Sequence, residues 1–461
     1  MRANKTIWFA LISLGFTIIL YFPILDGEAL WDDHIYLFRP RLIELNLWNY
    51  FNRYEWPIFH YFIDFLYLNF GKNLFIFHSL SIFFHLANGI LLFVCLKKII
   101  PRARFVALMF LLHPAQVLSV AWMVQIKTLL AANFVLLAVF FFLKFEELKR
   151  RKYFVLTVIF FILACKVKYS FVTLPLALIP YYLFIKSQST IKLKLKNKIT
   201  FGIIIIGFGF YMFSLFYSGR SLSHLHDMTD QLYQVDILKN ATHYLKASLL
   251  PYDFSPIYQF SNQTEFIPSI AVVTILFLLI IFGRNWKFSL IALMTFLLLN
   301  IPFWGIIFAP YMKITPVSDQ HLYLALIPLL ILIANFFEKL EIRFNIKRLA
   351  VTALALTCSW YFYVGLRYVP VYKSENNFYQ AILTRYPYHM TSLNNFISYL
   401  ARVQNYELAV KLMRVSFGRW DELQEFDRDN ILRIRKHISK FYPIPPELME
   451  YHDDGKKLNA N

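Results

Sequence analysis

Apolar runs separated by short polar segments recur along this chain and predict its architecture. About eleven of them approach the length that an α-helix needs to cross the roughly 30 Å hydrocarbon core of a bilayer. The pattern therefore predicts an all-α, polytopic membrane helix bundle with about 11 transmembrane helices. The predicted spans lie near residues 7–24, 74–96, 105–122, 129–143, 153–165, 170–185, 200–217, 266–282, 288–308, 322–337 and 350–366.

The polar segments differ in length. Most are short enough to be turns between neighbouring helices, whereas residues 25–73 and 218–265 form two long outer loops. Within the first loop, residues 58–70 are apolar with scattered charge, which is typical of a helix that lies along the membrane interface. Residues 1–370 thus form the predicted transmembrane domain.

The remaining residues, 371–461, are polar with a helical spacing of apolar positions. They predict two amphipathic helices joined by residues 402–405, a pattern that resembles one helix–turn–helix repeat of the tetratricopeptide kind. Because a solenoid needs about three repeats to be stable alone, we expect an extracytoplasmic helical cap packed on the membrane domain. The apolar positions of the two helices are Leu393, Phe396, Leu400, Tyr406, Ala409 and Leu412.

Composition supports the membrane class. Apolar residues make up 58% of the 461 and charged residues 16%, which is too little charge to cover a soluble protein of this size. The basic residues behind the net charge of +19 flank the apolar runs, which indicates topology signals facing anionic lipid rather than nucleic-acid binding. Cys95, Cys165 and Cys358 lie inside apolar runs and are predicted to be buried.

Loop charges orient the predicted bundle. With the N-terminus in the cytoplasm, every cytoplasmic loop is basic and the outer loops carry the acids, as the positive-inside rule requires. We expect a bacterial inner-membrane protein whose site faces the periplasm, although Asn240-Ala241-Thr242 and Asn262-Gln263-Thr264 would also suit the endoplasmic reticulum. The basic loops hold Lys97, Lys98, Arg102 and Arg104; Lys149, Arg150, Arg151 and Lys152; Lys192, Lys194, Lys196 and Lys198; Arg284 and Lys287; and Arg343, Lys347 and Arg348.

The pair Asp32 and Asp33 follows the first apolar run and is the best functional clue. One acid can act as a general base while the other orients the acceptor; the two can bind a divalent cation; or both are solvated loop residues. Trp31 and Tyr36 favour a site for a polyhydroxylated ligand, because aromatic side chains surround the acids. His34 is either a further member of this site or a surface residue.

Ionisable residues inside apolar segments are a second signal, because they are costly in a membrane. Lys127, Lys166 and Lys168 fall near the outer surface in the predicted topology, where a cation can bind the phosphate of a lipid-linked donor or extend to lipid headgroups. The second reading is favoured for Lys166. His113 is a donor-binding candidate or a core histidine, and Pro114 should kink or end its helix.

Asp319, His321 and Tyr323 open the tenth predicted span on the outer side. An acid, a histidine and a tyrosine there either complete the pocket of Asp32, with Asp319 and His321 contacting substrate, or form an ordinary interfacial cap.

Five segments together resemble the GT-C superfamily of polyprenyl-phosphate-sugar glycosyltransferases. The likeness is closest to the membrane O-mannosyltransferase-like proteins that end in tetratricopeptide repeats, and it covers about residues 25–330. No single segment is highly specific, but their order and spacing are. They are Trp31-Asp32-Asp33-His34-Ile35-Tyr36, Phe77-His78 through His85-Leu86-Ala87-Asn88, His113-Pro114 through Ala121-Trp122, Lys168 through Pro175, and the weaker Asp319-Gln320-His321-Leu322-Tyr323-Leu324.

The resemblance implies a specific reaction. Such enzymes move a sugar from a polyprenyl-phosphate donor to a hydroxyl of a protein, lipid or glycan on the extracytoplasmic side, with inversion at the anomeric carbon. It implies that Asp32 is the catalytic base and Asp33 its partner, and that no bound metal or other cofactor is needed. A divalent cation at the two acids is the less favoured alternative.

Three positions depart from the family pattern. Leu118, Ile126 and Gln320 stand where the family usually has charged residues. A glycosyltransferase with altered donor or acceptor remains the favoured hypothesis. A catalytically weakened scaffold or chaperone is the second, because those charges are missing. A lipid or solute transporter is the third, and it is disfavoured because the ionisable residues gather at one face.

Overall fold

The computed structural model describes residues 2–38, 46–54, 56–168, 170, 236–260, 266–283, 286–305, 310–344 and 346–449. Within these ranges the chain is helical, with connecting loops and no β-strand. The predicted all-α class is confirmed for this part. The predicted spans at 170–185 and 200–217 lie outside the described residues, apart from residue 170, as does the predicted Lys192–Lys198 loop.

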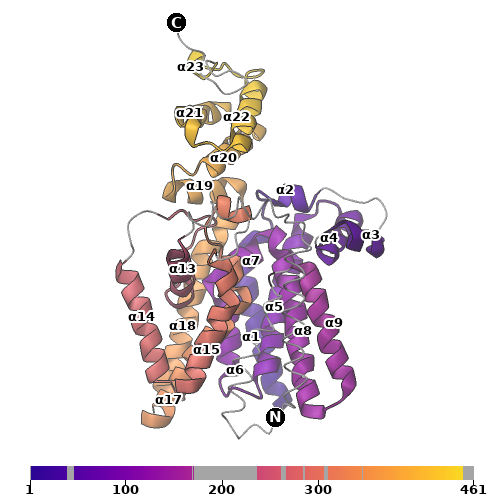
Figure 1. Ribbon diagram of the computed structural model, residues 1–461, viewed down its shortest axis with the longest axis vertical. Coiled ribbons are helices and arrows are strands. Elements are labelled where there is room, and N and C mark those ends of the chain that lie inside the picture. The colour runs from indigo at the N-terminus through magenta and orange to yellow at the C-terminus, as the bar shows by residue number, and fades with distance from the viewer. Residues whose placement is uncertain are drawn as a thin grey trace.

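Most helices run side by side in one bundle (Figure 1). Five of those described are long and apolar enough to cross a membrane, or seven if each of two bent pairs is one span. This supports a membrane protein, while the full number of eleven stays a prediction. The bundle contains α1 (Arg2–Tyr21), α5 (Leu74–Leu96), α6 (Ala103–Leu112), α7 (Val117–Ala121), α8 (Ile126–Leu148), α9 (Arg151–Val167), α14 (Phe266–Ile281), α15 (Trp286–Asn300), α16 (Leu322–Ala325), α17 (Ile327–Phe344) and α18 (Lys347–Tyr368).

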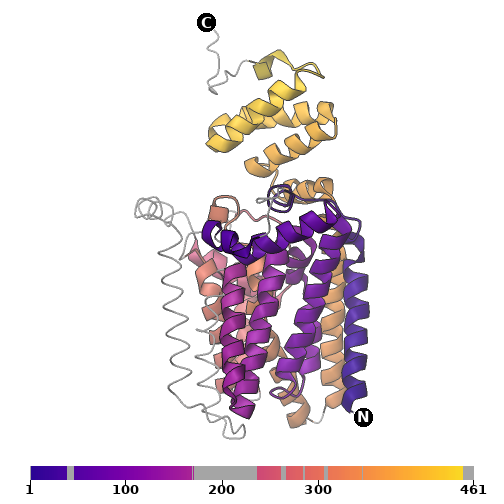
Figure 2. The ribbon, with the colours of Figure 1, turned by 90° about the vertical axis from the view of Figure 1, so that its right-hand side faces the viewer.

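Shorter elements connect these helices and cover one end of the bundle. In Figure 2, α4 lies across the ends of the long helices, while its place along the membrane interface stays a prediction. The short helices are α2 (Asp33–Tyr36), α3 (Leu47–Arg53), α4 (Pro57–Phe70) and α13 (Ile237–Leu249). The 3-10 turns are η1 (Phe22–Ile24), η2 (Pro114–Gln116), η3 (Met123–Gln125), η5 (Ile301–Phe303), η6 (Pro310–Lys313), η7 (Asp319–His321), η8 (Val369–Tyr372) and η9 (Trp420–Glu422).

Two bundle helices are bent at prolines. The predicted span 105–122 breaks after Leu112 with an angle of 53°, which confirms the kink expected at Pro114. The predicted span 322–337 is also broken, by 55° between α16 and α17, and this break was not predicted. Pro328 lies directly after it, where its ring and missing N–H oppose a continuous helix.

Basic loops gather at the end of the bundle that carries the N-terminus (Figure 1). Lys98, after α5, donates to both carboxylate oxygens of Glu147 in α8 at 2.7 and 2.8 Å. Arg102 pairs with Glu341 of α17. Three of the predicted cytoplasmic loops are thereby joined at one end, while α2 and the C-terminal helices lie at the other.

The C-terminal helices stack above the second end of the bundle (Figure 2). Leu393, Leu400 and Ala409 are buried, which confirms the two amphipathic helices expected there, while the tetratricopeptide likeness stays a prediction. Arg385 connects this unit to the segment after α13. Its guanidinium donates to both carboxylate oxygens of Asp253, at 2.5 and 2.6 Å. Its helices are α19 (Glu375–Arg385), α20 (Met390–Arg402), α21 (Tyr406–Gly418), α22 (Glu425–Ile438) and α23 (Pro446–Met449).

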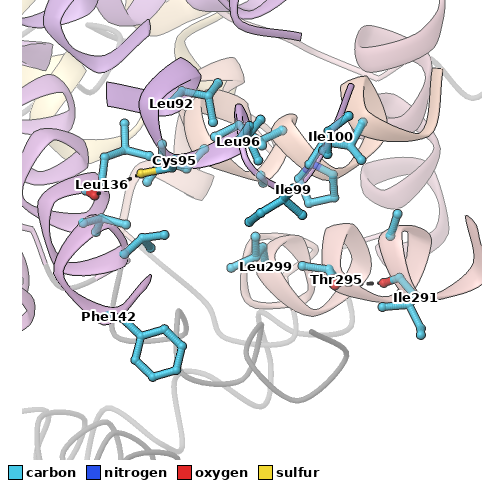
Figure 3. A pocket seen from close by; sticks show the side chains of 18 of the residues that line it. Leu92, Cys95, Leu96, Ile99, Ile100, Leu136, Phe142, Ile291, Thr295 and Leu299 are labelled. Atoms are coloured by element: carbon cyan, nitrogen blue, oxygen red, sulfur yellow. Dashed lines mark hydrogen bonds between the residues drawn. The ribbon is translucent and has the colours of Figure 1, made fainter. Parts of the chain in front are cut away.

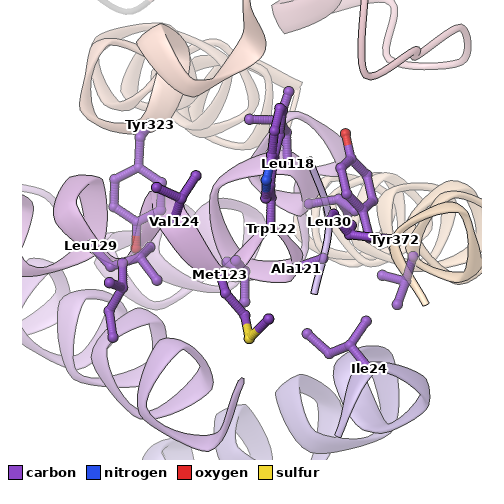
Figure 4. Close-up of a cluster of buried hydrophobic side chains, with 14 of the residues drawn as sticks. Ile24, Leu30, Leu118, Ala121, Trp122, Met123, Val124, Leu129, Tyr323 and Tyr372 are labelled. Atoms are coloured by element: carbon purple, nitrogen blue, oxygen red, sulfur yellow. The ribbon is translucent and has the colours of Figure 1, made fainter. Parts of the chain in front are cut away.

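A buried apolar cluster supports the loop that carries the two acids. In Figure 4, Leu30 of this loop lies with Trp122, Val124 and Tyr372, which come from distant parts of the sequence. The cluster therefore holds the loop in place at the end of the bundle.

All three cysteines are also buried and free, as predicted.

Candidate functional site

The loop before α2 has an unusual backbone. Trp31 has a φ of 36°, a left-handed conformation that bulky residues seldom adopt and that costs about 1–3 kcal/mol. Its surroundings must therefore hold it in place. Asp32 follows directly and serves as the N-cap residue of α2, without a side-chain capping bond.

Asp33 holds this loop through both of its carboxylate oxygens. Its side chain is completely buried. Oδ2 accepts a hydrogen bond from the Leu30 N–H at 2.9 Å, and Oδ1 accepts one from the Val124 N–H at 2.7 Å. Val124 belongs to η3, so Asp33 ties the acid loop to the segment between α7 and α8. This geometry favours a structural role for the second acid.

Asp32 is in a different environment. Its side chain is half-buried, and within the described part of the chain no group donates a hydrogen bond to its carboxylate. Burial raises the pKa of Asp32, and the nearby Lys127 ammonium opposes this shift. Of the two acids, Asp32 therefore has the carboxylate that is available to an incoming hydroxyl group.

The two carboxylates are engaged by groups other than a cation in this structure. Both Asp33 oxygens face N–H groups, and a lysine ammonium lies near Asp32. Among the described residues, no group of three or more acidic, histidine or cysteine side chains could hold a metal ion.

Lys127 lies at the first turn of α8, surrounded by aromatic rings. Its Nζ is 5.5 Å from the ring centre of Tyr36, 5.1 Å from Trp56 and 5.9 Å from Phe59, within the range of cation–π attraction. It interacts electrostatically with both Asp32 and Lys168. Lys127 thus lies between the acid loop and a second basic site.

That second basic site is Lys168, just after α9. Its Nζ donates to Thr128 Oγ1 at 2.7 Å and to Gln320 Oε1 at 3.2 Å. Both acceptors are neutral, and no carboxylate pairs with Lys168 among the described residues. Its Nζ is therefore not neutralised by an acid and can donate to an anionic ligand.

Lys168 also lines the polar end of an apolar groove. The groove has a volume of about 260 Å³ and runs between α5 and α8 on one side and α15 and α17 on the other. Figure 3 shows Leu96, Ile99 and Leu299 lining it. Phe288 and Leu299 of α15 both line the groove. The axial rise between them is about 17 Å, which is more than half of the roughly 30 Å hydrocarbon core.

His321 lies at the same end of the groove. Its ring stacks on Phe303, with centroids 3.8 Å apart and an interplanar angle of 14°. Both ring nitrogens are buried and lack a hydrogen-bond partner within the described residues. Because such groups are costly when unpaired, His321 is a candidate for a hydrogen bond to a ligand in the groove.

The Asp319 carboxylate, by contrast, is not accessible to a substrate in this structure. It is fully buried, its Oδ1 lies 3.0 Å from His243 Nε2, and its Oδ2 accepts from the Tyr258 hydroxyl at 2.6 Å. His243 and Tyr258 were not predicted, since neither stands in a recognisable motif. These bonds favour a role for Asp319 in holding the second outer loop against η7.

His113 is similarly occupied. Its Nδ1 accepts from the Ala115 N–H at 3.2 Å, and its Nε2 lies 3.2 Å from the Ser248 carbonyl oxygen. The structure therefore does not bring His113 to Lys168, and the core-histidine interpretation fits its contacts better.

The remaining predicted residues surround Asp32: the Trp31 and His34 side chains face α19, whereas Tyr36 faces Lys127.

A polar network inside the bundle was not predicted from the sequence. His85 Nδ1 lies 2.8 Å from the Tyr323 hydroxyl, which accepts from Asn88 Nδ2 at 3.1 Å. Tyr323 thus packs in the core rather than at the outer mouth of the groove. The spacing of Ser81, His85 and Asn88 on one face of a helix could have indicated this network.

No family model, curated protein or solved structure matches this chain. The function is therefore inferred from the residues and geometry of the site.

Proposed function

We propose that the protein is a membrane glycosyltransferase that moves a sugar from a polyprenyl-phosphate donor to a hydroxyl acceptor. One arrangement carries the proposal: an apolar groove that spans more than half of the hydrocarbon core ends at Lys168 and His321, and Lys127 links this end electrostatically to Asp32. The groove suits a long isoprenoid chain and the lysine suits its phosphate. The acceptor is the hydroxyl of a protein, lipid or glycan.

Each side chain then has a role in the transfer. Asp32 removes the proton from the acceptor hydroxyl, whose oxygen attacks the anomeric carbon from the face opposite the phosphate. The bond between that carbon and the phosphate oxygen breaks, and polyprenyl phosphate leaves with the electron pair. Lys168 and Lys127 stabilise the negative charge that develops on it. The configuration at the sugar inverts.

Replacing Lys168 with glutamine should weaken donor binding by about 10- to 150-fold, because a hydrogen bond to a charged group contributes about 1.5–3 kcal/mol. The measurement is KM for a polyprenyl-phosphate sugar. Lys166→Gln is the matched control, two residues away: its Nζ lies 5.9 Å from the Phe51 ring and it does not line the groove. Equal KM values for K168Q and the parent would remove Lys168 from the donor site.

The pH dependence of kcat/KM should follow Asp32. Burial raises the pKa of Asp32 above that of a solvated aspartate, and only the deprotonated carboxylate can act as base. The rate should therefore fall on the acidic side of neutrality, at a higher pH than a solvated aspartate would give, and this limb should be absent in Asp32→Asn. An identical acidic limb in both proteins would assign it to another group.

The assay that tests the proposed function uses purified protein in lipid nanodiscs with a panel of labelled polyprenyl-phosphate hexoses and pentoses. Transfer to an acceptor, with release of polyprenyl phosphate, is expected for at least one donor. A folded protein that consumes none of them would favour the scaffold hypothesis, which the uncharged Leu118, Ile126 and Gln320 also suggest. Solute or lipid flux that persists in Asp32→Asn would favour a transporter.

The proposed orientation places Asp32 on the extracytoplasmic side of a bacterial inner membrane. Single cysteines introduced at the exposed positions Asp26 and Lys98 should react with an impermeant thiol reagent from opposite sides of oriented vesicles. In intact cells only the Asp26→Cys variant should be labelled. Labelling of the Lys98→Cys variant alone would show the opposite orientation.

A further inference from the structure

The acid loop is bound on its outer side by the start of the C-terminal unit. The Glu28 N–H donates to the Lys373 carbonyl oxygen at 2.8 Å, and the Glu375 N–H donates to Glu28 Oε2 at 3.0 Å. The second bond joins positions 347 residues apart. They fix the backbone just before Asp32.

Trp31 extends this contact with its ring. The ring centroid lies 6.1 Å from Phe378 in an edge-on arrangement and 5.9 Å from Tyr379. The side chains of Phe378 and Tyr379 are 0% and 2% exposed, so α19 offers a closed aromatic surface. Aromatic packing of this kind gives the stabilisation needed to hold Trp31 at its positive φ.

The residues around Asp32 are held by the same helix. His34 Nε2 lies 3.7 Å from Glu375 Oε1, and Glu375 also pairs with Arg402 of α20. Phe378 meets Trp122 with centroids 5.3 Å apart, two residues before the N–H that anchors Asp33. Helix α19 therefore contacts the loop on both sides of Asp32 and the segment beneath it.

We propose that α19 is a positioning element of the Asp32 site, in which Phe378 and Tyr379 hold Trp31 in its left-handed conformation and thereby direct the Asp32 carboxylate. The catalytic consequence rests on the proposed function; the effect on the loop does not. The C-terminal unit is then part of the site, in addition to any surface that it offers to acceptors. Phe378 and Tyr379 act through Trp31 and are not themselves catalytic residues.

Hydrogen–deuterium exchange of the full-length protein tests the structural part. Phe378→Ala should raise amide exchange in residues 28–37 by about tenfold or more, because the loop opens locally without its aromatic contact. Phe417→Ala is the matched control. Phe417 is also a buried ring of the C-terminal unit, 2% exposed, but it stacks on Trp420 and not on the loop.

A second variant keeps the test independent of damage to the C-terminal core. Trp31→Gly removes the ring from the loop side, while glycine accepts the positive φ without strain. It should raise exchange in residues 28–37 as Phe378→Ala does. If Phe378→Ala raises exchange no more than Phe417→Ala, or if Trp31→Gly leaves the loop as protected as in the parent, the positioning role is wrong.

Transfer kinetics test the catalytic part. A displacement of about 1 Å at a reacting group can cost about 100-fold in rate, so Phe378→Ala should lower kcat by about that factor while KM for the donor stays unchanged. Phe417→Ala should keep both constants. A parent protein without transfer activity would refute the proposed function but leave the exchange result standing, whereas normal kcat in a Phe378→Ala protein would refute the positioning role.

Discussion

Asp32→Asn should lower kcat by about 100- to 10,000-fold, the usual contribution of a general base. The asparagine keeps the size of the side chain but cannot accept the proton of the acceptor hydroxyl. Because no described group donates to the Asp32 carboxylate, the substitution breaks no hydrogen bond of the fold. The measurement is single-turnover transfer at saturating donor.

Stability should not fall in this variant. The pKa of Asp32 is raised in the folded protein, so the proton binds more tightly there than in the unfolded chain. The stability linked to this group is fully present below its unfolded pKa and is lost as pH rises through the folded pKa. Removing the charge should therefore leave thermal stability at neutral pH unchanged or slightly higher. A clearly lower unfolding temperature would mean that Asp32 is structural.

Asp33→Asn should have the opposite effect and destabilise the protein by about 2–4 kcal/mol. Both carboxylate oxygens accept backbone N–H groups, and an amide offers only one acceptor, so an NH₂ group would face the N–H of Leu30 or Val124. Leaving a buried donor unpaired costs about 1–3 kcal/mol, and the opposing NH₂ group adds to this cost. Denaturant unfolding in micelles measures the change.

Asp26→Asn is the control for both substitutions. Asp26 is in the same loop, but its side chain is 72% exposed and its only described ion pair is with Lys373 at 3.0 Å. Water and salt screen an exposed ion pair, so it adds little to stability, and this variant should keep both stability and turnover. An Asp33→Asn protein as stable as Asp26→Asn would show that the two N–H contacts do not anchor the loop.

The membrane bundle could be predicted from sequence because hydrophobic length is a local property. The kink at Pro114 was predictable for the same reason, since a proline acts on its own helix. The break before Pro328 was missed because the apolar run continues through it. The two amphipathic helices of the C-terminal unit were likewise visible in their own spacing.

The roles of the two acids could not be separated from sequence. Asp32 and Asp33 are neighbours of the same residue type, and they differ only in which distant groups meet them. The N–H that occupies Asp33 belongs to Val124, 91 residues later. In the same way, the pairing of His243 with Asp319 joins residues 76 apart. Such contacts depend on the folded arrangement and leave no local pattern.

For the two lysines, too, the sequence indicated the residues but not their contacts. Their rarity in apolar segments marked Lys127 and Lys168 as candidates, and the structure places both beside the proposed site. The aromatic neighbours of Lys127 come from α2, from α4 and from Trp56, the residue that precedes α4. The groove at Lys168 is lined by five α-helices, α5, α8, α15, α16 and α17. Neither could be derived without the packing.

The most direct test compares the parent, Asp32→Asn and Asp33→Asn in one transfer assay with labelled polyprenyl-phosphate sugars. Each protein is first heated to a temperature below the parent's unfolding temperature. Turnover is then calculated per molecule of protein that remains monodisperse. We expect a folded, donor-binding Asp32→Asn protein with almost no transfer, and an Asp33→Asn protein that is lost on heating but transfers sugar where it stays folded. Full transfer by folded Asp32→Asn protein would contradict the assignment of Asp32 as the base.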